Sequence, residues 1–171
     1  MKKTLIALLL SSMATLALTL GEIPNEITLE NKNGGLVDGK AWNSTMLKGK
    51  VHLLLYVDPD KQSENEDFID RLHEKKYDKS NYGSIAIINL KATWLPNFAI
   101  EKKLKTQQKI FPDTLYVKDK TKHLVQEWGL ADNSSNIVIF NKKGEIIYIY
   151  SGFIDKKEAS TIFTLIENRL K

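Results

Sequence analysis

Two short, continuously apolar runs separated by a helical pattern constrain the fold of this chain more than any other feature. Val51 to Val57 and Ser84 to Leu90 are each seven residues long, which suits a strand buried on both faces and is too short for a buried helix. Between them, Phe68, Ile69 and Leu72 repeat at helical spacing. A helix between two buried strands predicts a right-handed crossover that makes the strands parallel.

The other patterns extend this unit to a mixed sheet between helical layers. Asn33-Gly34-Gly35 predicts a turn after the short strand Ile27–Leu29, and hence a small hairpin near the N-terminus. Further along, the patterns predict, in order, a helix from Phe98 to Leu104 or beyond, a strand over 114–117, a short helix over 124–128, an antiparallel hairpin of 137–140 with 146–150, and a helix over 156–170. We therefore expect an α/β fold with three α/β/α layers and a mixed central sheet, plus the N-terminal hairpin.

The N-terminal segment is typical of a secretory signal peptide. Two lysines precede a mostly apolar stretch from Leu5 to Leu20, which serines and threonines interrupt. As a membrane span the stretch is marginal, because about 20 strongly apolar residues are usually needed. We expect residues 1–21 to be a signal peptide cleaved after Ala17 or Gly21, and residues 22–171 to form a single domain in a bacterial periplasm.

The charge and cysteine content exclude several classes of partner and function. Loss of the two lysines at positions 2 and 3 lowers the formal net charge from +4 to +2. The basic residues are dispersed and form no stripe with aromatic residues, so we expect no nucleic-acid partner and, after signal cleavage, no membrane partner. Because the chain contains no cysteine, its stability has to come from its core rather than from disulfides.

Several landmarks resemble the thioredoxin fold. The run Leu47-Lys-Gly-Lys-Val51 looks like the approach to the first core strand in periplasmic thiol reductases. The turn Asn141-Lys-Lys-Gly144, with Gly152 beyond it, looks like the end of the same fold. The resemblance implies a thioredoxin-like α/β/α sandwich.

A more specific similarity is to the YtfJ family of periplasmic proteins. It rests on Ala41-Trp42-Asn43-Ser44, on Trp128-x-Leu130 and on Ser134-Ser135 ahead of a core strand. The resemblance implies a thioredoxin-like fold without conserved redox cysteines. It implies no particular activity, since none is established for the family.

The positions that carry redox chemistry in thioredoxin-like enzymes hold other residues here. Counted from Gly49, the two catalytic cysteines fall at Lys61 and Glu64, and the cis-proline of the fold falls at Ser135. Thiol–disulfide exchange needs a thiolate, so the absence of cysteine excludes oxidoreductase activity of that type. Neither a calcium-loop pattern nor a serine–histidine triad is matched, and we assign no catalytic residue, metal ligand or cofactor.

What remains is a binding hypothesis centred on the degenerate active-site groove. We expect the turn after the first core strand to face the Ser134–Ser135 loop and to hold a periplasmic protein or an extended peptide by strand addition. Trp94, in a loop, is the expected exposed contact, and Ser63 or Asn65 is expected to cap the helix after the turn. The candidate binding residues are Asp58, Asp60, Lys61, Glu64, Ser134, Ser135 and Trp94. The alternative is an enzyme or a small-molecule-binding protein that uses the same groove.

Overall fold

A six-stranded mixed sheet forms the centre of the molecule in a computed structural model that describes residues 17–171. The strand order is β2-β6-β5-β4-β7-β8, and a separate pair joins β1 to β3. The strands are β1 (Thr28–Leu29), β2 (Gly34–Leu36), β3 (Trp42–Asn43), β4 (Val51–Val57), β5 (Tyr82–Asn89), β6 (Thr114–Asp119), β7 (Ser135–Phe140) and β8 (Ile146–Ser151). Most of the predicted signal peptide, residues 1–16, lies outside the described residues.

The sheet topology confirms the predicted crossover. β4 and β5 run parallel, with Val51 opposite Tyr82, and β5 and β6 also run parallel. β7 pairs antiparallel with both β4 and β8, so the predicted hairpin forms the other side of the sheet. The carboxyl ends of β4, β5 and β6 therefore lie at one edge, together with the start of β7.

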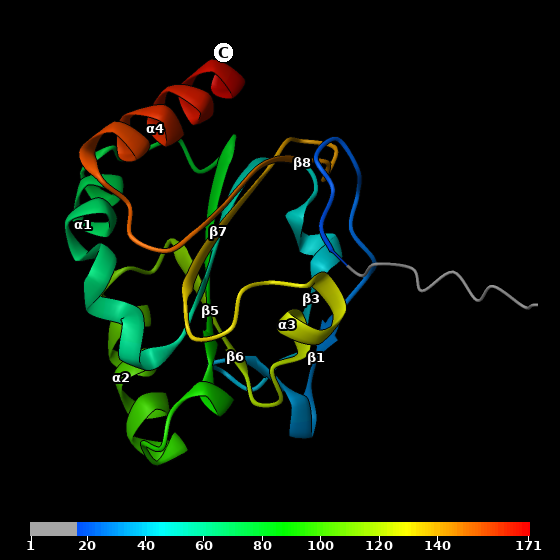
Figure 1. Ribbon diagram of the computed structural model, residues 1–171, viewed down its shortest axis with the longest axis vertical. Helices are drawn as coiled ribbons and strands as arrows, with labels where there is room; N and C mark the ends of the chain where they lie inside the picture. The colour runs from blue at the N-terminus through cyan, green and yellow to red at the C-terminus, as the bar shows by residue number, and fades with distance from the viewer. Residues whose placement is uncertain (1–16) are drawn as a thin grey trace, which may run out of the picture.

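Helices and the N-terminal segment cover the two faces of this sheet (Figure 1). One face carries α1 (Glu66–Glu74), α2 (Asn97–Ile110) and α4 (Lys156–Leu170), and the other carries α3 (His123–Trp128) with the β1–β3 pair. Alternate residues of β4 contribute to two cores: Leu53 packs with Phe68 and Ile162 of the first layer, and Leu54 packs with Trp42 and Trp128 of the second. This is the predicted three-layer sandwich. Within residues 17–171, no helix is long and apolar enough to span a membrane.

The N-terminal strands pair differently from the predicted order. Gly34 and Gly35 were expected in a turn, but they form β2, which pairs antiparallel with β6 at the edge of the main sheet. β1 pairs with β3 instead of with the residues after the glycine pair, and Leu29 lies opposite Trp42. Glycine is needed at position 34 because its φ is +134° and a Cβ there would lie 1.8 Å from the carbonyl oxygen of Lys118. The glycine pair thus marks a close approach of two strands rather than a turn.

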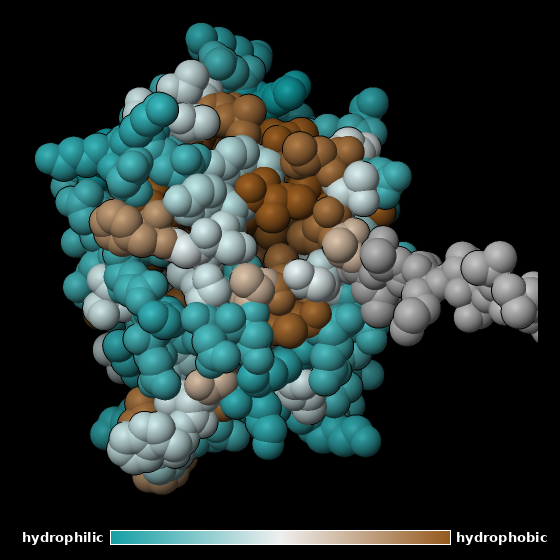
Figure 2. All heavy atoms as spheres, in the orientation of Figure 1, coloured by the Kyte–Doolittle hydropathy of each residue, from teal (hydrophilic) through white to brown (hydrophobic). Residues whose placement is uncertain are grey.

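The segment ahead of β1 lies against the β8 side of the sheet. The Leu18 N–H donates to the Trp128 carbonyl oxygen at 3.2 Å, and the Gly21 N–H donates to the Ile146 carbonyl oxygen at 2.7 Å. Figure 2 shows hydrophobic surface gathered over β8 on a face that is otherwise largely hydrophilic. Cleavage after Ala17 would retain both hydrogen bonds, whereas cleavage after Gly21 would remove them.

Candidate functional site

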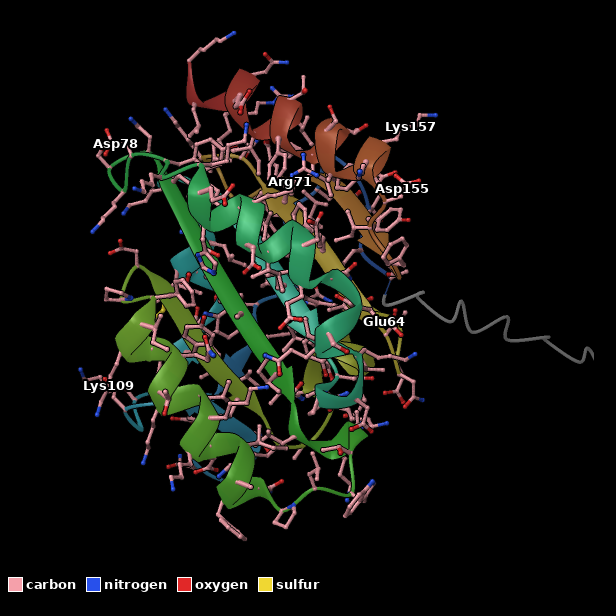
Figure 3. The ribbon with its side chains drawn as sticks, turned by 90° about the vertical axis from the view of Figure 1, so that its left-hand side faces the viewer. Glu64, Arg71, Asp78, Lys109, Asp155 and Lys157 are labelled. Carbon is pink, nitrogen blue, oxygen red and sulfur yellow. The ribbon has the colours of Figure 1, made fainter. Side chains whose placement is uncertain are left out.

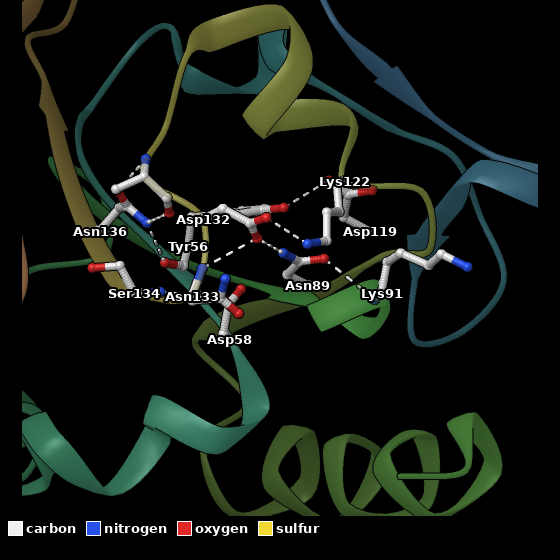
Figure 4. Close-up of polar contacts among 11 residues, drawn as sticks. Tyr56, Asp58, Asn89, Lys91, Asp119, Lys122, Asp132, Asn133, Ser134 and Asn136 are labelled. Atoms are coloured by element: carbon white, nitrogen blue, oxygen red, sulfur yellow. Dashed lines mark hydrogen bonds and ion pairs between the residues drawn. The ribbon is translucent and has the colours of Figure 1, made fainter. Parts of the chain in front are cut away.

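The candidate site lies at the edge where β4, β5 and β6 end (Figure 4). A 3₁₀ helix over Pro59–Asn65 follows β4 and leads into α1. The loop before β7 meets this turn: Val57 pairs with Ser135, and the Asp58 N–H donates to the Ser134 carbonyl oxygen at 3.2 Å. The structure therefore brings together the two segments that the sequence places at the groove.

The backbone of the Ser134–Ser135 loop is already paired within the chain. The Ser134 N–H donates to Oδ2 of Asp58 at 3.0 Å, and the Ser134 carbonyl oxygen accepts from Asp58. The Ser135 carbonyl oxygen accepts from the Gly152 N–H at 2.8 Å. An extended peptide that used the Ser134 groups for strand addition would have to displace Asp58. The Asp58 carboxylate thus occupies the hydrogen-bonding position that the binding hypothesis gives to a partner.

Asp58 itself is an unusually placed carboxylate. Its side chain is buried, and its Oδ1 has no hydrogen-bond partner among the described residues. Burial raises the pKa of Asp58, and the nearby negative charge of Asp132 raises the pKa further. Asp58 and Ser135 are only 1% and 2% exposed, so neither is accessible to a substrate in this structure.

We expect Asp58→Asn to stabilise the protein at neutral pH. Because the folded state raises the pKa of Asp58, it favours the protonated form, and the stability from this group is lost as pH rises through the folded-state pKa. An uncharged amide can still accept from the Ser134 N–H and removes the buried charge, so we expect a gain of about 1 kcal/mol at pH 7. Thermal melting at pH 7 and pH 4 should show a larger gain at pH 7. An equal or smaller gain at pH 7 would contradict this assignment.

Behind Asp58, a buried carboxylate organises the start of α3. Oδ1 of Asp119 accepts from the backbone N–H groups of Thr121 and His123, both at 3.0 Å. Its Oδ2 accepts from the Leu124 N–H at 3.0 Å and from the Tyr56 hydroxyl at 3.1 Å. Burial also raises the pKa of Tyr56, which keeps its hydroxyl protonated as a donor. All four contacts fix the position of α3 against β4 and β6.

Two asparagines and an ion pair hold the loop before β7. Oδ1 of Asn136 accepts from the Ala131 N–H, and its Nδ2 donates to the Ala131 carbonyl oxygen, each at 2.9 Å. Asp132 in the same loop pairs with Lys122 and accepts a long contact of 3.5 Å from Nδ2 of Asn89. Asn89, Asp119 and Asn136 were not identified from the sequence. Only Asp119 carries a local signal, because it stands just ahead of a helix start where a carboxylate can cap free N–H groups.

The outer surface of the turn is polar and locally paired. Lys61 and Glu64, at the two positions where a redox enzyme would hold cysteines, form an ion pair of 2.5 Å. Oδ1 of Asp60 accepts from the Thr93 hydroxyl at 3.0 Å, and this bond ties the turn to the loop that carries Trp94. Lys103 of α2 also reaches the turn, donating to Oε1 of Gln62 at 2.8 Å.

Asn65 differs from its predicted role. It was expected as a helix cap, but its side chain makes no capping hydrogen bond to α1. Instead its Nδ2 donates to the Gly152 carbonyl oxygen at 3.0 Å, and its Oδ1 accepts from the Ile154 N–H at 2.8 Å. The buried Asn65 therefore fastens the turn to the connection between β8 and α4.

The three tryptophans separate into two roles. Trp42 and Trp128 are buried in the core of the α3 face. Trp94 is 86% exposed, as expected, and lies close in the chain to Phe98 at 76% and Leu95 at 39% exposure. The structure thus leaves three apolar side chains of one chain segment exposed, the Trp94 patch (Trp94, Leu95 and Phe98), next to Thr93, which is hydrogen-bonded to the degenerate turn.

The fold and the cysteine-free turn together define a thioredoxin-like protein that lacks the groups for thiol–disulfide exchange. Its fold is similar to that of a thiol-disulfide isomerase from Corynebacterium glutamicum, with a TM-score of 0.60 and 16% identity over 86% of this chain and 97% of that one. It is also similar to the exposed lipoprotein thioredoxin Etrx1 from Streptococcus pneumoniae, with a TM-score of 0.55 and 15% identity over 84% and 98% of the two chains.

The chain belongs to the YtfJ family. The family model described as "Bacterial protein of unknown function (YtfJ_HI0045)" matches residues 20–169. The protein described as "Uncharacterized protein YtfJ" from Escherichia coli strain K12 is 24% identical over 136 residues, which span 77% of this chain and 73% of that protein. The family expected from the tryptophan and serine motifs is therefore confirmed.

Proposed function

We propose that this protein is a non-catalytic binding protein of the bacterial periplasm that recognises a protein partner beside its degenerate active-site turn. The observation that carries the proposal is the Trp94 patch. A partner that covers large, exposed apolar side chains lowers the free energy of the complex. Tryptophan is enriched among the residues that dominate binding energy. The N-terminal segment, which is typical of a signal peptide, supports the periplasmic location.

The surface around the Trp94 patch has the composition of a protein interface. Asp60 on the turn is hydrogen-bonded to Thr93 next to the patch, and Lys61 and Glu64 follow it on the same turn, so polar side chains flank the apolar residues on that side. Contacts to side chains replace the strand addition that the sequence suggests, since the Ser134 backbone is occupied by Asp58. The partner is therefore a polypeptide with an apolar pocket or groove that accepts an aromatic anchor.

The alternative of small-molecule or enzymatic chemistry at the same groove has less support. It relies on Asp58 and Ser135, which are buried, and on Asp60, which is hydrogen-bonded to Thr93. A protein partner needs only the exposed side chains. The geometry of this edge therefore favours protein recognition.

Site-specific photo-crosslinking in cells tests the proposal. A photoreactive amino acid replaces Lys61 or Leu95, and a matched control replaces Lys143, which is exposed in the turn between β7 and β8. Lys103 is unsuitable as a control because it contacts the turn. We expect a discrete protein adduct at both test positions and none at Lys143. Absence of a discrete adduct at Lys61 and Leu95 would refute the proposal.

Trp94→Ala should weaken partner binding while leaving the fold intact. Loss of a tryptophan anchor typically costs about 2 kcal/mol or more, which corresponds to roughly a thirty-fold weaker Kd. The melting temperature should change little, because the side chain is 86% exposed. Ile23→Ala is the control, since Ile23 is also a large apolar residue with 53% exposure but precedes β1 and follows Glu22, whose carbonyl oxygen accepts from the N–H of Ile146 at the other end of the sheet. Equal losses in both variants would argue against a specific anchor at Trp94.

A further inference from the structure

Two adjoining cavities form an elongated cleft between α1 and α2, which lie on the same face of the sheet (Figure 3). Its larger cavity, of about 710 Å³, lies where β5 and β6 begin, on the side of the molecule bounded by the loop with Asp78 and the α2 end with Lys109. A second cavity of about 440 Å³ continues along β5 towards the Pro59–Asn65 turn. Each volume lies in the range of sites for small organic ligands, about 300 to 1,000 Å³.

Local sequence explains why the cleft stays open. α2 buries Ile100 and Leu104, while the residues that follow them in the helix are mostly polar and at least partly exposed. β6 starts opposite Ser84, so the first residues of β5 pair only with β4. One of these, Gly83, lies directly against the His52 ring, and a Cβ there would lie 2.4 Å from that ring.

One aromatic pair divides the cleft into its two cavities. His73 of α1 stacks on Phe111, just after α2, with ring centroids 3.8 Å apart and planes at 7°. Both residues line both cavities. Six residue steps along β5, from Tyr82 to Ile88, cover about 20 Å of strand. The two cavities also share Leu72, Ser84 and Thr114 in their linings, so an elongated ligand that lies along β5 can extend from one cavity into the other.

The walls of the larger cavity are suited to an apolar ligand body. Ile110 and Leu115 are 57% and 38% exposed at this end of α2 and β6, although both are large aliphatic residues. Leu72, Phe111 and Pro112 continue the apolar lining. In the second cavity the floor is formed by Leu55, Ala86 and Ile88. An apolar chain placed in the larger cavity would remove the exposed surfaces of Ile110 and Leu115 from water.

The polar groups of the larger cavity are suited to an anion. Lys50, Lys76 and Lys79 line it, and Asp113 is the one carboxylate in its lining. Lys79 pairs with Asp113 at 2.6 Å, which leaves an excess of positive charge. The Tyr82 hydroxyl, in the same lining, is buried and has no partner in the described chain. Burial lowers the pKa of His52 and of His73, so the lysines supply the positive charge.

We propose that the cleft between α1 and α2 binds an amphipathic organic anion. The carboxylate or phosphate group lies among Lys50, Lys76 and Lys79, and the apolar chain extends along β5 past the His73–Phe111 pair. This site lies on the helical face of the sheet, separate from the Trp94 patch, so it is independent of the proposed function. A free fatty acid and a monoacyl phospholipid both provide this chemistry.

Calorimetric titration with matched probes tests the ligand class. Decanoate, below its micelle concentration, should bind at one saturable site. Decyltrimethylammonium has the same chain with a cationic head and should bind at least about ten-fold more weakly, while butyrate has the charge without the chain and should not bind. Absence of saturable decanoate binding, or equal binding of the cationic probe, would overturn the proposal. Comparison of decanoate with a decanoyl lysophosphatidylglycerol then shows which source binds more tightly.

Paired variants test the location. K76E/K79E reverses two lysines of the cavity, and K102E/K105E makes the same charge change at two exposed lysines of α2 that do not line it. We expect the first variant to weaken decanoate binding at least about ten-fold and the second to leave it within about two-fold. Ile110→Glu, in the apolar wall, should also abolish binding. Decanoate binding that survives both K76E/K79E and Ile110→Glu would refute this site, provided that circular dichroism shows each variant folded.

Discussion

Asp119→Ala should cost about 4 kcal/mol of unfolding free energy, the largest loss that we expect from a single polar substitution at this edge of the sheet. The substitution leaves the Tyr56 hydroxyl and the N–H groups of Thr121, His123 and Leu124 without their acceptor. These groups lie in or next to the core, where an unsatisfied donor costs about 1 to 3 kcal/mol. The melting temperature should fall by roughly 8 to 16 °C.

Tyr56→Phe is the matched control for this prediction. It removes one of the four hydrogen bonds and leaves the Asp119 carboxylate with its three backbone donors, so we expect a loss of about 1 kcal/mol. Chemical denaturation of both single variants and the double variant measures how strongly the two positions are coupled. If Asp119→Ala were no more destabilising than Tyr56→Phe, the carboxylate would not be the group that positions α3.

The stability and binding predictions involve different residues, and this allows them to be separated. Asp119, Asn136 and Asp58 are buried and hold the loops at the end of the sheet. The Trp94 patch is exposed and contributes little to the fold. Substitutions at this edge therefore test the fold, and substitutions in the Trp94 patch test the proposed binding.

Periodicity predicted most elements because it reports on local burial. The apolar runs of β4 and β5 and the apolar stripe of α4 each depend on neighbours within a few residues. The facing of Asp58 and Ser134 was predictable as well, because the resemblance to the thioredoxin fold implies it. By contrast, the Gly34–Gly35 pair has the composition of a turn, and only its approach to Lys118 in β6 makes it a strand.

Side-chain roles that span long sequence separations were not predictable. Asp58 occupies the hydrogen-bonding position of the expected peptide through a contact 76 residues away, and no local pattern indicates this. The cleft between α1 and α2 depends on where the two helices end relative to the first residues of β5, which pair with β4 and precede the pairing with β6. Sequence reasoning located the degenerate turn and Trp94, while the structure showed which of the side chains nearby are exposed and which are buried.

Asn65→Ala should cost about 3 kcal/mol and loosen the degenerate turn from the rest of the fold. Its amide joins the turn to the Gly152 carbonyl oxygen and to the Ile154 N–H, so truncation leaves both backbone groups without these partners. The melting temperature should fall by roughly 6 to 12 °C, and amide hydrogen exchange at Ile154 should accelerate.

Ser63→Ala is the control that separates this bridging role from helix capping. Ser63 lies in the same turn, is exposed, and was the other residue expected to cap α1. Because its side chain has no role in fastening the turn, its loss should cost no more than about 0.5 kcal/mol. A cost at Ser63 equal to that at Asn65 would mean that helix capping dominates here. A cost confined to Asn65 would mean that the contact of Asn65 with the β8–α4 connection holds this turn in a fixed position.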